Sequence, residues 1–546
     1  MKKSIITTIL VVFLITFFGG FLRFYKITQN PPSLNGDELS FGYAAYSILK
    51  TGKDEYGVRL PLVFKSVGDY KNPVLGYLLI LPVKIFGLTD FAVRFPNALV
   101  GTFSIPIFFL FLLDIFKKKK IAYIGSLFLA INPLDVYFSR VAYESLIAGL
   151  FIIFAIWAFM KLLDGKKLWA FVSAFFFTLT MYTAPAPRLF VPVFVFAALL
   201  ISIPTLKKNW KVFTIFIITC LVLGLPMVYT TLFLGSGTRF NMVFLTHDID
   251  FIRHILLKYF DSFKDIPLLF FFWIERYINY FQPDFIFSNA LHMTTLDSFG
   301  LGLLYLFDIP LLATGIFAFI KKQIPHKNIF VIWLLTGIVP DSITNNLQQG
   351  GRLIHIVPVI IIITTLGLLE CVKWFNSLKS LFLRILIAGA YFSFVILILI
   401  HAFLVFSVHF PNEKSESYDE GLKQVSLYIS EHQSQYKEII IDTRHGVDAP
   451  SLISNPFLYL NFYLKYDPAT YQTEPKISGT SSNPYYHYNK YTFTYINWPV
   501  DSKKTDTLFI GSPWSFPSDL QGVKILDTIY LTNGHIAYYI VIPKKP

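Results

Sequence analysis

The sequence predicts an α-helical membrane protein of about eleven transmembrane helices, followed by a small α/β domain outside the membrane. Its composition is one reason: 54% of the 546 residues are hydrophobic, only 15% are charged, and 58 are Phe. A soluble domain could not bury so much apolar surface. The other reason is the number of apolar runs of about 17 residues or more, which can cross a hydrocarbon core of roughly 30 Å as helices.

The predicted spans account for most of the first 408 residues. In chain order they run near 4–22, 91–116, 121–138, 142–163, 168–184, 189–206, 212–234, 302–320, 329–343, 353–372 and 385–408. Two further apolar stretches, 73–88 and 266–281, are interrupted by Pro or charged residues and predict interfacial or re-entrant helices. The first span follows basic residues, as a signal peptide does, but no small-residue cleavage site follows it. We therefore interpret it as an anchor.

Lysine and arginine gather at every second span boundary, and cytoplasmic loops retain such positive charge. The clusters are Lys2 with Lys3, residues 117–120, Lys161 with Lys166 and Lys167, Lys207 with Lys208 and Lys211, Lys321 with Lys322 and Lys327, and Lys373 with Lys379 and Arg384. This pattern predicts a plasma-membrane protein with a cytoplasmic N-terminus. It places outside the loops 23–90, 235–300 and 341–352, together with the tail. The net charge of +13 reflects these clusters and anionic lipid, and it makes no case for nucleic acid.

Residues 410–546 differ in composition from residues 1–409, and their pattern predicts a separate extracytoplasmic α/β domain. This part is polar and rich in Tyr, with an amphipathic helical pattern over 418–431. Short β-like runs follow at 438–442, 507–510 and 535–542. It contains no metal-ligand spacing, nucleotide-binding loop or nucleophile elbow, so we expect the chemistry to lie in the transmembrane domain, 1–409.

The first external loop carries an adjacent acidic pair, Asp37 and Glu38, at the start of a helical pattern that ends at Thr51-Gly52. Asp37 as a helix N-cap, with Glu38 in the first turn, is the purely structural interpretation. A carboxylate fixed in this way is also a well-oriented base, so the two interpretations are compatible. Because neighbouring side chains on a helix point about 100° apart, we expect separate roles rather than one shared proton. One carboxylate would act as general base and the other would orient a hydroxyl.

Four cations are predicted on the outer face, where the charge rule leaves few. They are Lys71 before Pro73, and one arginine in each of three short external loops: Arg140, Arg188 and Arg352. Each cation alone is explained by snorkelling or by ordinary lipid headgroups. Together, beside an acidic pair, they favour an anionic lipid-linked substrate.

Glu144 follows Arg140 by four residues, so the two side chains pair if a helix has begun by that point. A carboxylate at the bilayer edge needs such a partner or a polar cavity. Either way Glu144 belongs to a polar cluster near the outer face.

The large loop 235–300 contains His247, Asp248, His292 and Asp297, but their spacing is not that of a metal site. We therefore expect no metal to be bound there.

Several motifs resemble the bacterial members of the dolichyl-phosphate-mannose protein mannosyltransferase family, to which the aminoarabinose transferases are related. All are GT-C membrane glycosyltransferases. The motifs are Asn35-Gly-Asp-Glu38, Lys50-Thr-Gly-Lys-Asp-Glu-Tyr-Gly57, Tyr70-Lys-Asn-Pro73, Ala92-Val-Arg-Phe-Pro96 and Tyr280-Phe-Gln-Pro-Asp-Phe285, with the region 340–358. They cover most of the membrane portion in the family's order.

The resemblance implies an inverting transfer of a sugar from a polyprenyl phosphate to an acceptor hydroxyl at the outer face. Asp37 would match the essential aspartate of the first loop, and Glu38 the acidic neighbour that positions the acceptor. Lys71 and Arg352 would contact the donor phosphate. Arg140 and Glu144 match a second polar cluster more loosely. We add Arg140 and Arg188 to the phosphate-binding cations on their positions in the external loops.

The chain also departs from the family. Lys71-Asn-Pro73 stands in place of the eukaryotic His-Pro-Pro pattern, and the tail after 410 resembles neither a MIR-type β-trefoil nor closely the terminal domain of the aminoarabinose enzyme. The acceptor, a protein or a glycan or lipid, is therefore open. We expect catalysis without a metal or other cofactor.

Two alternatives remain at the level of sequence. A flippase or transporter of lipid-linked saccharides also needs an external cationic cavity, but it predicts internal symmetry, and the sequence shows none. A catalytically inactive scaffold that displays the tail domain is the other, and the intact acidic pair argues against it.

Overall fold

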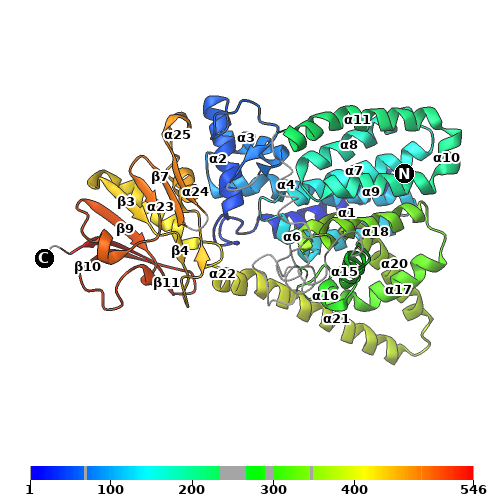
Figure 1. Cartoon of the computed structure of the whole chain (residues 1–546). Helices are drawn as coiled ribbons and strands as arrows, with labels where there is room; N and C mark the ends of the chain where they lie inside the picture. Colours follow the sequence, from blue (N-terminus) through cyan, green and yellow to red (C-terminus); the bar gives the residue numbers. More distant parts are fainter. Residues whose placement is uncertain are drawn as a thin grey trace. The chain divides into compact units, whose positions relative to one another are not determined.

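The structure is a computed structural model, and it describes residues 2–66, 70–233, 266–288, 290, 301–344, 349–480 and 483–544 (Figure 1). Most of the predicted large loop 235–300 lies outside the described residues. His247, Asp248, His292 and Asp297 are among those outside.

The chain forms two compact units, each built from segments distant in sequence. The first, which we call the helical unit, comprises Met1–Tyr25, Leu62–Leu75 and Asn97–Leu404. The second, the sheet unit, comprises Lys26–Pro61, Gly76–Pro96 and Val405–Pro546. Helices α3 (Pro73–Phe86) and α4 (Asp90–Phe116) each run from one unit into the other.

The helical unit is a bundle whose longer helices are nearly continuous runs of apolar residues. Its α-helices besides α4 are α1 (Lys2–Phe24), α5 (Lys119–Ile131), α6 (Pro133–Phe138), α7 (Glu144–Leu163), α8 (Lys167–Thr183), α9 (Pro187–Ile201), α10 (Ile203–Lys208), α11 (Trp210–Phe233), α15 (Ile266–Asn279), α16 (Pro283–Phe287), α17 (Ile309–Lys321), α18 (Lys327–Ser342), α19 (Gly350–Leu353), α20 (Val357–Ser377) and α21 (Leu381–Leu404). A short hairpin, β1 (Phe64–Lys65) and β2 (Tyr70–Lys71), completes it.

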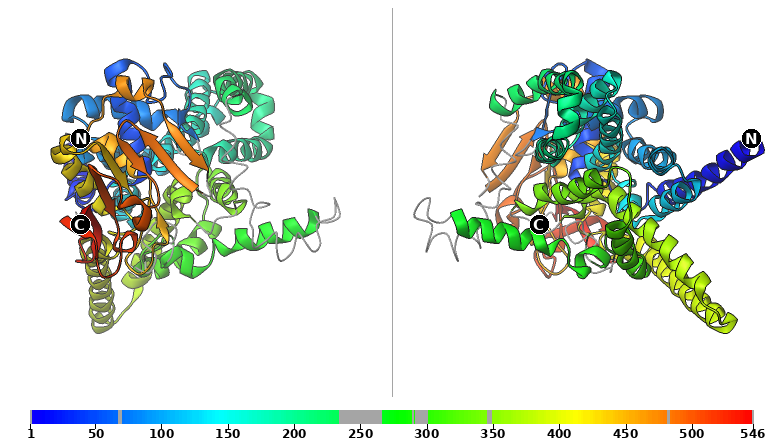
Figure 2. Two further views of the ribbon diagram at one scale, coloured as in Figure 1. Left: turned by 60° about the vertical axis from the view of Figure 1, so that its left-hand side comes forward. Right: turned by 90° about the vertical axis from the view of Figure 1, so that its right-hand side faces the viewer.

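Six helices among the described residues are long and apolar enough to cross a membrane, so the chain is a multi-pass membrane protein. Two of these spans, Ile5–Phe24 and the one that starts with α21, have only 11% of their most apolar window buried inside the protein. Figure 2 shows α1 and α21 projecting from the other helices of the unit. Their exposed Leu, Ile and Phe side chains suit a lipid solvent rather than water.

The structure corrects the predicted continuous span 121–138, which is two helices, α5 and α6. Asn132 ends α5, and its side chain accepts a hydrogen bond from the Asp135 amide, which caps α6. Pro133 at the first position of α6 lacks the amide hydrogen that would continue α5. With 13 residues, α5 rises only about 20 Å.

The stretch 302–320 is also helical over only part of its length, because α17 begins at Ile309 after a one-turn 3-10 helix, η4 (Leu306–Asp308). The stretches 73–88 and 266–281, by contrast, form the helices α3 and α15.

A buried ion pair fastens α1 to the helical unit. Arg23, whose side chain is fully buried, pairs with Asp135 and donates hydrogen bonds to the carbonyls of Ala130 at 2.9 Å and Leu129 at 3.2 Å. A buried arginine is stable only when its donors are satisfied in this way. Arg23, the residue just after the first predicted span, therefore has a structural role inside the helical unit.

The sheet unit contains a seven-stranded mixed sheet in the order β10-β11-β9-β3-β8-β7-β6. Its strands are β3 (Glu438–Ile441), β6 (Ile477–Thr480), β7 (Asn483–Tyr488), β8 (Tyr491–Phe493), β9 (Thr507–Gly511), β10 (Val523–Tyr530) and β11 (Ile536–Pro543). The central strand β3 is parallel to both neighbours, with Ile440 opposite Thr492 and Phe509, and the remaining pairs are antiparallel. Because β3 is covered on both faces, Ile439, Ile440 and Ile441 are all buried.

Among its described residues, the C-terminal part also contains five α-helices between or before the strands, and two of them pack against the first loop. The five are α22 (Phe410–Glu413), α23 (Glu420–His432), α24 (Pro456–Tyr463), α25 (Pro468–Thr473) and α26 (Trp498–Asp501). The helix predicted over 418–431 and the three predicted strands are confirmed as α23, β3, β9 and β11. Within the same unit, α24 and α25 pack against α2 (Gly36–Thr51) of the first loop (Figure 1).

Candidate active site

The predicted acidic pair lies at the first turn of α2, and the two carboxylates have different environments. Asn35 is the N-cap: its side-chain oxygen accepts the Glu38 amide at 3.0 Å, and the Glu38 carboxylate accepts the Asn35 amide at 3.0 Å. This is a capping box. The structural interpretation of Asp37 as the N-cap is therefore wrong, since Asn35 takes that role. Asp37 is an exposed residue of the first turn, whereas Glu38 is fully buried.

Glu38 forms a buried ion pair with Arg94 of α4. The guanidinium donates from Nε to Oε1 at 3.1 Å and from Nη2 to Oε2 at 3.3 Å, and both side chains are 0% exposed. Arg94 also donates to the carbonyls of Ile27, Pro31 and Ser33 in the approach to α2. The pair thus fixes the loop that precedes Asp37, and Glu38 is oriented by protein groups on both carboxylate oxygens.

Lys71 and Arg188 both lie in the helical unit, and Asn72 connects their segments. Lys71 pairs with Phe64 in the β1–β2 hairpin and is 4% exposed, so it is not a snorkelling side chain. The Arg188 guanidinium, near the start of α9, donates from Nη2 to Oδ1 of Asn72. The other amide atom, Asn72 Nδ2, is buried and has no hydrogen-bond partner among the described residues. These segments bring two cations and an amide donor into one region.

Arg352 lies in α19 and pairs with Asp341 at the end of α18. Its Nη1 donates to Asp341 Oδ1 at 3.0 Å and to Thr344 Oγ1 at 2.7 Å. Asp341 is fully buried and also accepts the Tyr280 hydroxyl at 2.7 Å and the Gln349 amide at 2.8 Å. The Arg352 side chain remains 19% exposed. It is therefore a cation held by a buried carboxylate with part of its surface still accessible.

Arg140 and Glu144 occupy a turn and a helix start. Arg140 lies just before α7, which begins at Glu144, so the two are not successive turns of one helix. Arg140 is 6% exposed, and its guanidinium donates from Nη1 to the Leu22 carbonyl at 2.8 Å, next to the buried Arg23. Glu144 is half-buried. Arg140 thereby contributes to holding the end of α1.

The predicted residues fall into both units. Asp37 and Glu38 belong to the sheet unit, and Lys71, Arg140, Glu144, Arg188 and Arg352 belong to the helical unit. Four residues with clear roles here were not predicted as site residues, namely Asn72, Arg94, Tyr280 and Asp341. A signal for Asp341 exists in the sequence, since a carboxylate inside an apolar run needs a partner.

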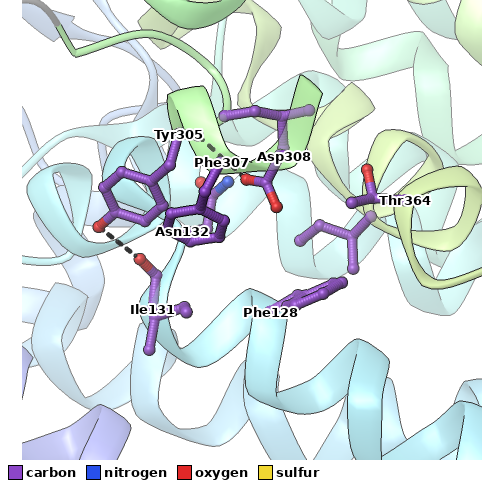
Figure 3. Close-up of a pocket in the computed structure, with 9 residues that line it drawn as sticks. Phe128, Ile131, Asn132, Tyr305, Phe307, Asp308 and Thr364 are labelled. Atoms are coloured by element: carbon purple, nitrogen blue, oxygen red, sulfur yellow. Dashed lines mark hydrogen bonds between the residues drawn. The ribbon is translucent and has the colours of Figure 1, made fainter. Parts of the chain in front are cut away.

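A small pocket in the helical unit is lined by none of the predicted site residues. It is lined by Phe128, Asn132, Tyr305, Asp308 and Thr364 among others (Figure 3). The polar groups there serve the chain itself: Tyr305 donates to the Ile131 carbonyl at 2.8 Å, and Asp308 accepts the Tyr305 amide at 3.1 Å. We assign it a structural role. No group of three or more His, Cys, Asp or Glu residues within the described ranges is arranged to hold a metal ion.

Comparison with known proteins bears on these residues directly. Residues 70–229 match the family model described as dolichyl-phosphate-mannose-protein mannosyltransferase. That stretch includes Lys71, Arg140, Glu144 and Arg188. No curated protein sequence matches the chain.

Two crystal structures of ArnT from Cupriavidus metallidurans have the same fold. The apo structure aligns with a TM-score of 0.55 at 12% identity, covering 99% of this chain and 98% of that chain. The structure bound to undecaprenyl phosphate aligns with a TM-score of 0.54 at 12% identity and the same coverage. The predicted resemblance is confirmed: residues 70–229 match the model of the dolichyl-phosphate-mannose-protein mannosyltransferase family, and the chain has a fold like that of ArnT.

Proposed function

We propose that this protein transfers a sugar, with inversion at the anomeric carbon, from a polyprenyl-phosphate donor to a hydroxyl of a protein, glycan or lipid acceptor. The observation that carries the proposal is the first turn of α2, where an exposed carboxylate, Asp37, adjoins a buried and fully oriented one, Glu38. An accessible base on a rigid helix start is what activation of an acceptor hydroxyl requires.

The reaction balances with the groups at hand. The acceptor oxygen attacks the anomeric carbon as its proton passes to Asp37, and the bond from that carbon to the phosphate oxygen breaks. The electron pair leaves with the phosphate, which becomes a stable monoester, so no general acid is needed. Preorganised cations lower the barrier by stabilising the charge that develops on this oxygen.

We assign the phosphate to the cations of the helical unit. Lys71, with Arg188 close by through Asn72, and the partly exposed Arg352 would bind it, with Arg140 and Glu144 as a polar cluster that supports the end of α1. Arginine suits this task because its planar donors match phosphate oxygens in pairs. Glu38 would position the acceptor side indirectly, through the loop that it fixes with Arg94.

The lipid part of the donor is proposed from the related fold, since one of the ArnT structures holds undecaprenyl phosphate. We further propose about eleven spans, a cytoplasmic N-terminus, and an active site and C-terminal domain on the outer face of the plasma membrane, because the lysine clusters alternate along the chain. Transfer is proposed to be metal-independent, so that a chelator leaves the rate unchanged.

The experiment is transfer from a radiolabelled polyprenyl-phosphate sugar by the purified protein in detergent. Asp37→Asn removes the base and is expected to lower kcat by at least about a thousandfold while the protein still folds. The matched control is Asp448→Asn, an exposed aspartate elsewhere in the sheet unit. Activity of Asp37→Asn close to that of the control would exclude Asp37 as the base.

A second pair of variants tests the phosphate assignment in the same assay. Lys71→Ala is expected to raise the donor KM or lower kcat/KM by about tenfold or more, since one charge-assisted contact is lost. Lys65→Ala changes the exposed lysine of the same hairpin and is expected to leave both constants unchanged. Equal donor use by the two variants would remove Lys71 from the site.

A further inference from the structure

Helix α24 of the C-terminal part contacts both helices that carry the buried Glu38–Arg94 pair. Towards α2, Leu458 lies 3.5 Å from the position that a Cβ on Gly36 would take, and Phe462 would come within 2.6 Å of a Cβ on Gly42. Towards α4, the Tyr463 hydroxyl donates to the carboxylate of Asp90, the first residue of that helix, at 3.0 Å. Two glycines of α2 thus leave room for α24.

The closest connection to Asp37 is made by Tyr459. This side chain is 1% exposed, and its hydroxyl lies 2.9 Å from the carbonyl of Leu34, three residues before Asp37. The carbonyl of Tyr418 and a carboxylate oxygen of Asp419 are also near, at 3.3 and 3.5 Å. A hydroxyl donates one hydrogen at a time, and the shortest of the three contacts is to Leu34. Burial raises the pKa of Tyr459 well above its usual value, so the hydroxyl keeps that hydrogen.

The far end of α2 is held by the same part of the chain. The side-chain amide nitrogen of Gln472 in α25, which carries two hydrogens, lies within hydrogen-bond distance of three acceptors: the Asp54 carbonyl at 2.8 Å, Thr51 Oγ1 at 3.0 Å and Ser47 Oγ at 3.1 Å. The Tyr43 hydroxyl donates to the Tyr466 carbonyl at 3.0 Å. Helix α2 is therefore bound along its length by α24, α25 and the segment that joins them.

We propose that Tyr459 is a positioning residue for sugar transfer, and that α24 makes the C-terminal domain an integral part of the catalytic site. The proposal rests on the proposed function, because it takes Asp37 to be the base. Tyr459 does not touch substrate. It fixes the Leu34 carbonyl, and with it the orientation of the Asn35 cap and of Asp37. A general base must be placed within a fraction of an ångström, so a loosened cap lowers the rate of the chemical step.

The test compares Tyr459→Phe with Tyr488→Phe in the full chain. Tyr488 is an equally buried tyrosine of the sheet unit, and its hydroxyl donates to Asn461 of α24 at 2.7 Å. The control therefore loses a hydrogen bond of the same kind to α24 itself, while the bond from Tyr459 to the Leu34 carbonyl stays in place. Tyr459→Phe is expected to lower kcat about tenfold with an unchanged donor KM. Tyr488→Phe is expected to change kcat by less than about twofold.

Hydrogen exchange provides a readout that does not depend on activity. Amides of residues 35–39 are expected to exchange faster in Tyr459→Phe than in Tyr488→Phe. Equal kcat values and equal exchange in the two variants would overturn the proposal. Asp37→Asn, assayed alongside, separates the two ideas. If Asp37→Asn is inactive and the two tyrosine variants are alike, only the positioning role fails. If Asp37→Asn is active, the proposed base itself fails.

Discussion

Two arginines, Arg94 in the sheet unit and Arg352 in the helical unit, each pair with a fully buried carboxylate, yet they differ in how many of their donors are used. Arg94 uses all five N–H groups: two bonds go to Glu38, and three go to the backbone carbonyls of Ile27, Pro31 and Ser33. Among the residues that the structure describes, Arg352 donates from Nη1 alone, to Asp341 and Thr344. Its Nε and Nη2 groups make no hydrogen bond to any residue that the structure describes.

This difference separates a structural arginine from one that is available to a ligand. A guanidinium with every donor satisfied and no exposed surface has nothing left to offer a phosphate, so Arg94 shapes the loop before Asp37. A guanidinium that is anchored through one nitrogen and 19% exposed keeps a planar edge for an anion. The number of donors already in use therefore distinguishes the structural Arg94 from the ligand-accessible Arg352. Their distance in sequence from the acidic pair does not make this distinction.

The largest expected effect is on folding, at Arg94. Arg94→Ala leaves Glu38 as a buried charge without its cation and three carbonyls without donors, so we expect a loss of about 3–5 kcal/mol in the free energy of unfolding. Arg94→Lys keeps the charge but lacks the planar five-donor geometry, and we expect it to recover less than half of that loss. Thermal unfolding in detergent, followed by tryptophan fluorescence, measures both. A melting temperature of Arg94→Lys equal to that of the wild type would refute the saturated-arginine argument.

The elements that the sequence predicted well are those with a local signal. Helix α2 ends at Thr51 with Gly52 in the left-handed region, as the Thr51-Gly52 pair predicted, and α23 follows the amphipathic pattern over 418–431. The capping box also has a local signal, because Asn35 and Glu38 are three residues apart. This spacing identifies Asn35 rather than Asp37 as the cap. The break between α5 and α6 was signalled by Asn132-Pro133 in the same way.

What the sequence could not reveal depends on contacts between distant segments. Whether Arg94 faces lipid, substrate or carbonyls is decided by the path of residues 27–33, which no periodic pattern encodes. The packing of α24 on α2 likewise joins positions more than 400 residues apart, as Tyr459 and Leu34 show. The predicted division into domains 1–409 and 410–546 stays a prediction. The compact sheet unit combines residues after 404 with segments of the first loop.

The second expected effect is on function, at Arg352. It is tested with the same arginine-to-lysine substitution that was proposed for Arg94. Arg352→Lys keeps a cation for Asp341 but removes the planar edge, so kcat/KM for the donor is expected to fall about tenfold, equivalent to roughly 1.4 kcal/mol. The melting temperature is expected to stay within about 2 °C of the wild type. Steady-state transfer at varied donor concentration gives the first quantity. If Arg352→Lys instead loses stability and keeps donor use, the two arginines have the same role and the comparison fails.

The smallest expected effect is at Tyr280, which holds the carboxylate that holds Arg352. Tyr280→Phe removes one donor from Asp341 Oδ2, which still accepts the Gln349 amide, while Oδ1 still accepts Arg352. Because the carboxylate remains paired, we expect a loss of about 0.5–1.5 kcal/mol in unfolding free energy, the usual cost of one hydrogen bond, and a fall in kcat/KM of less than about threefold. The same deletion in the Arg352→Lys background decides whether the hydroxyl acts through the arginine. If it does, the effect of Tyr280→Phe on kcat/KM shrinks when Lys occupies position 352; equal effects in both backgrounds would show that Tyr280 and Arg352 act independently.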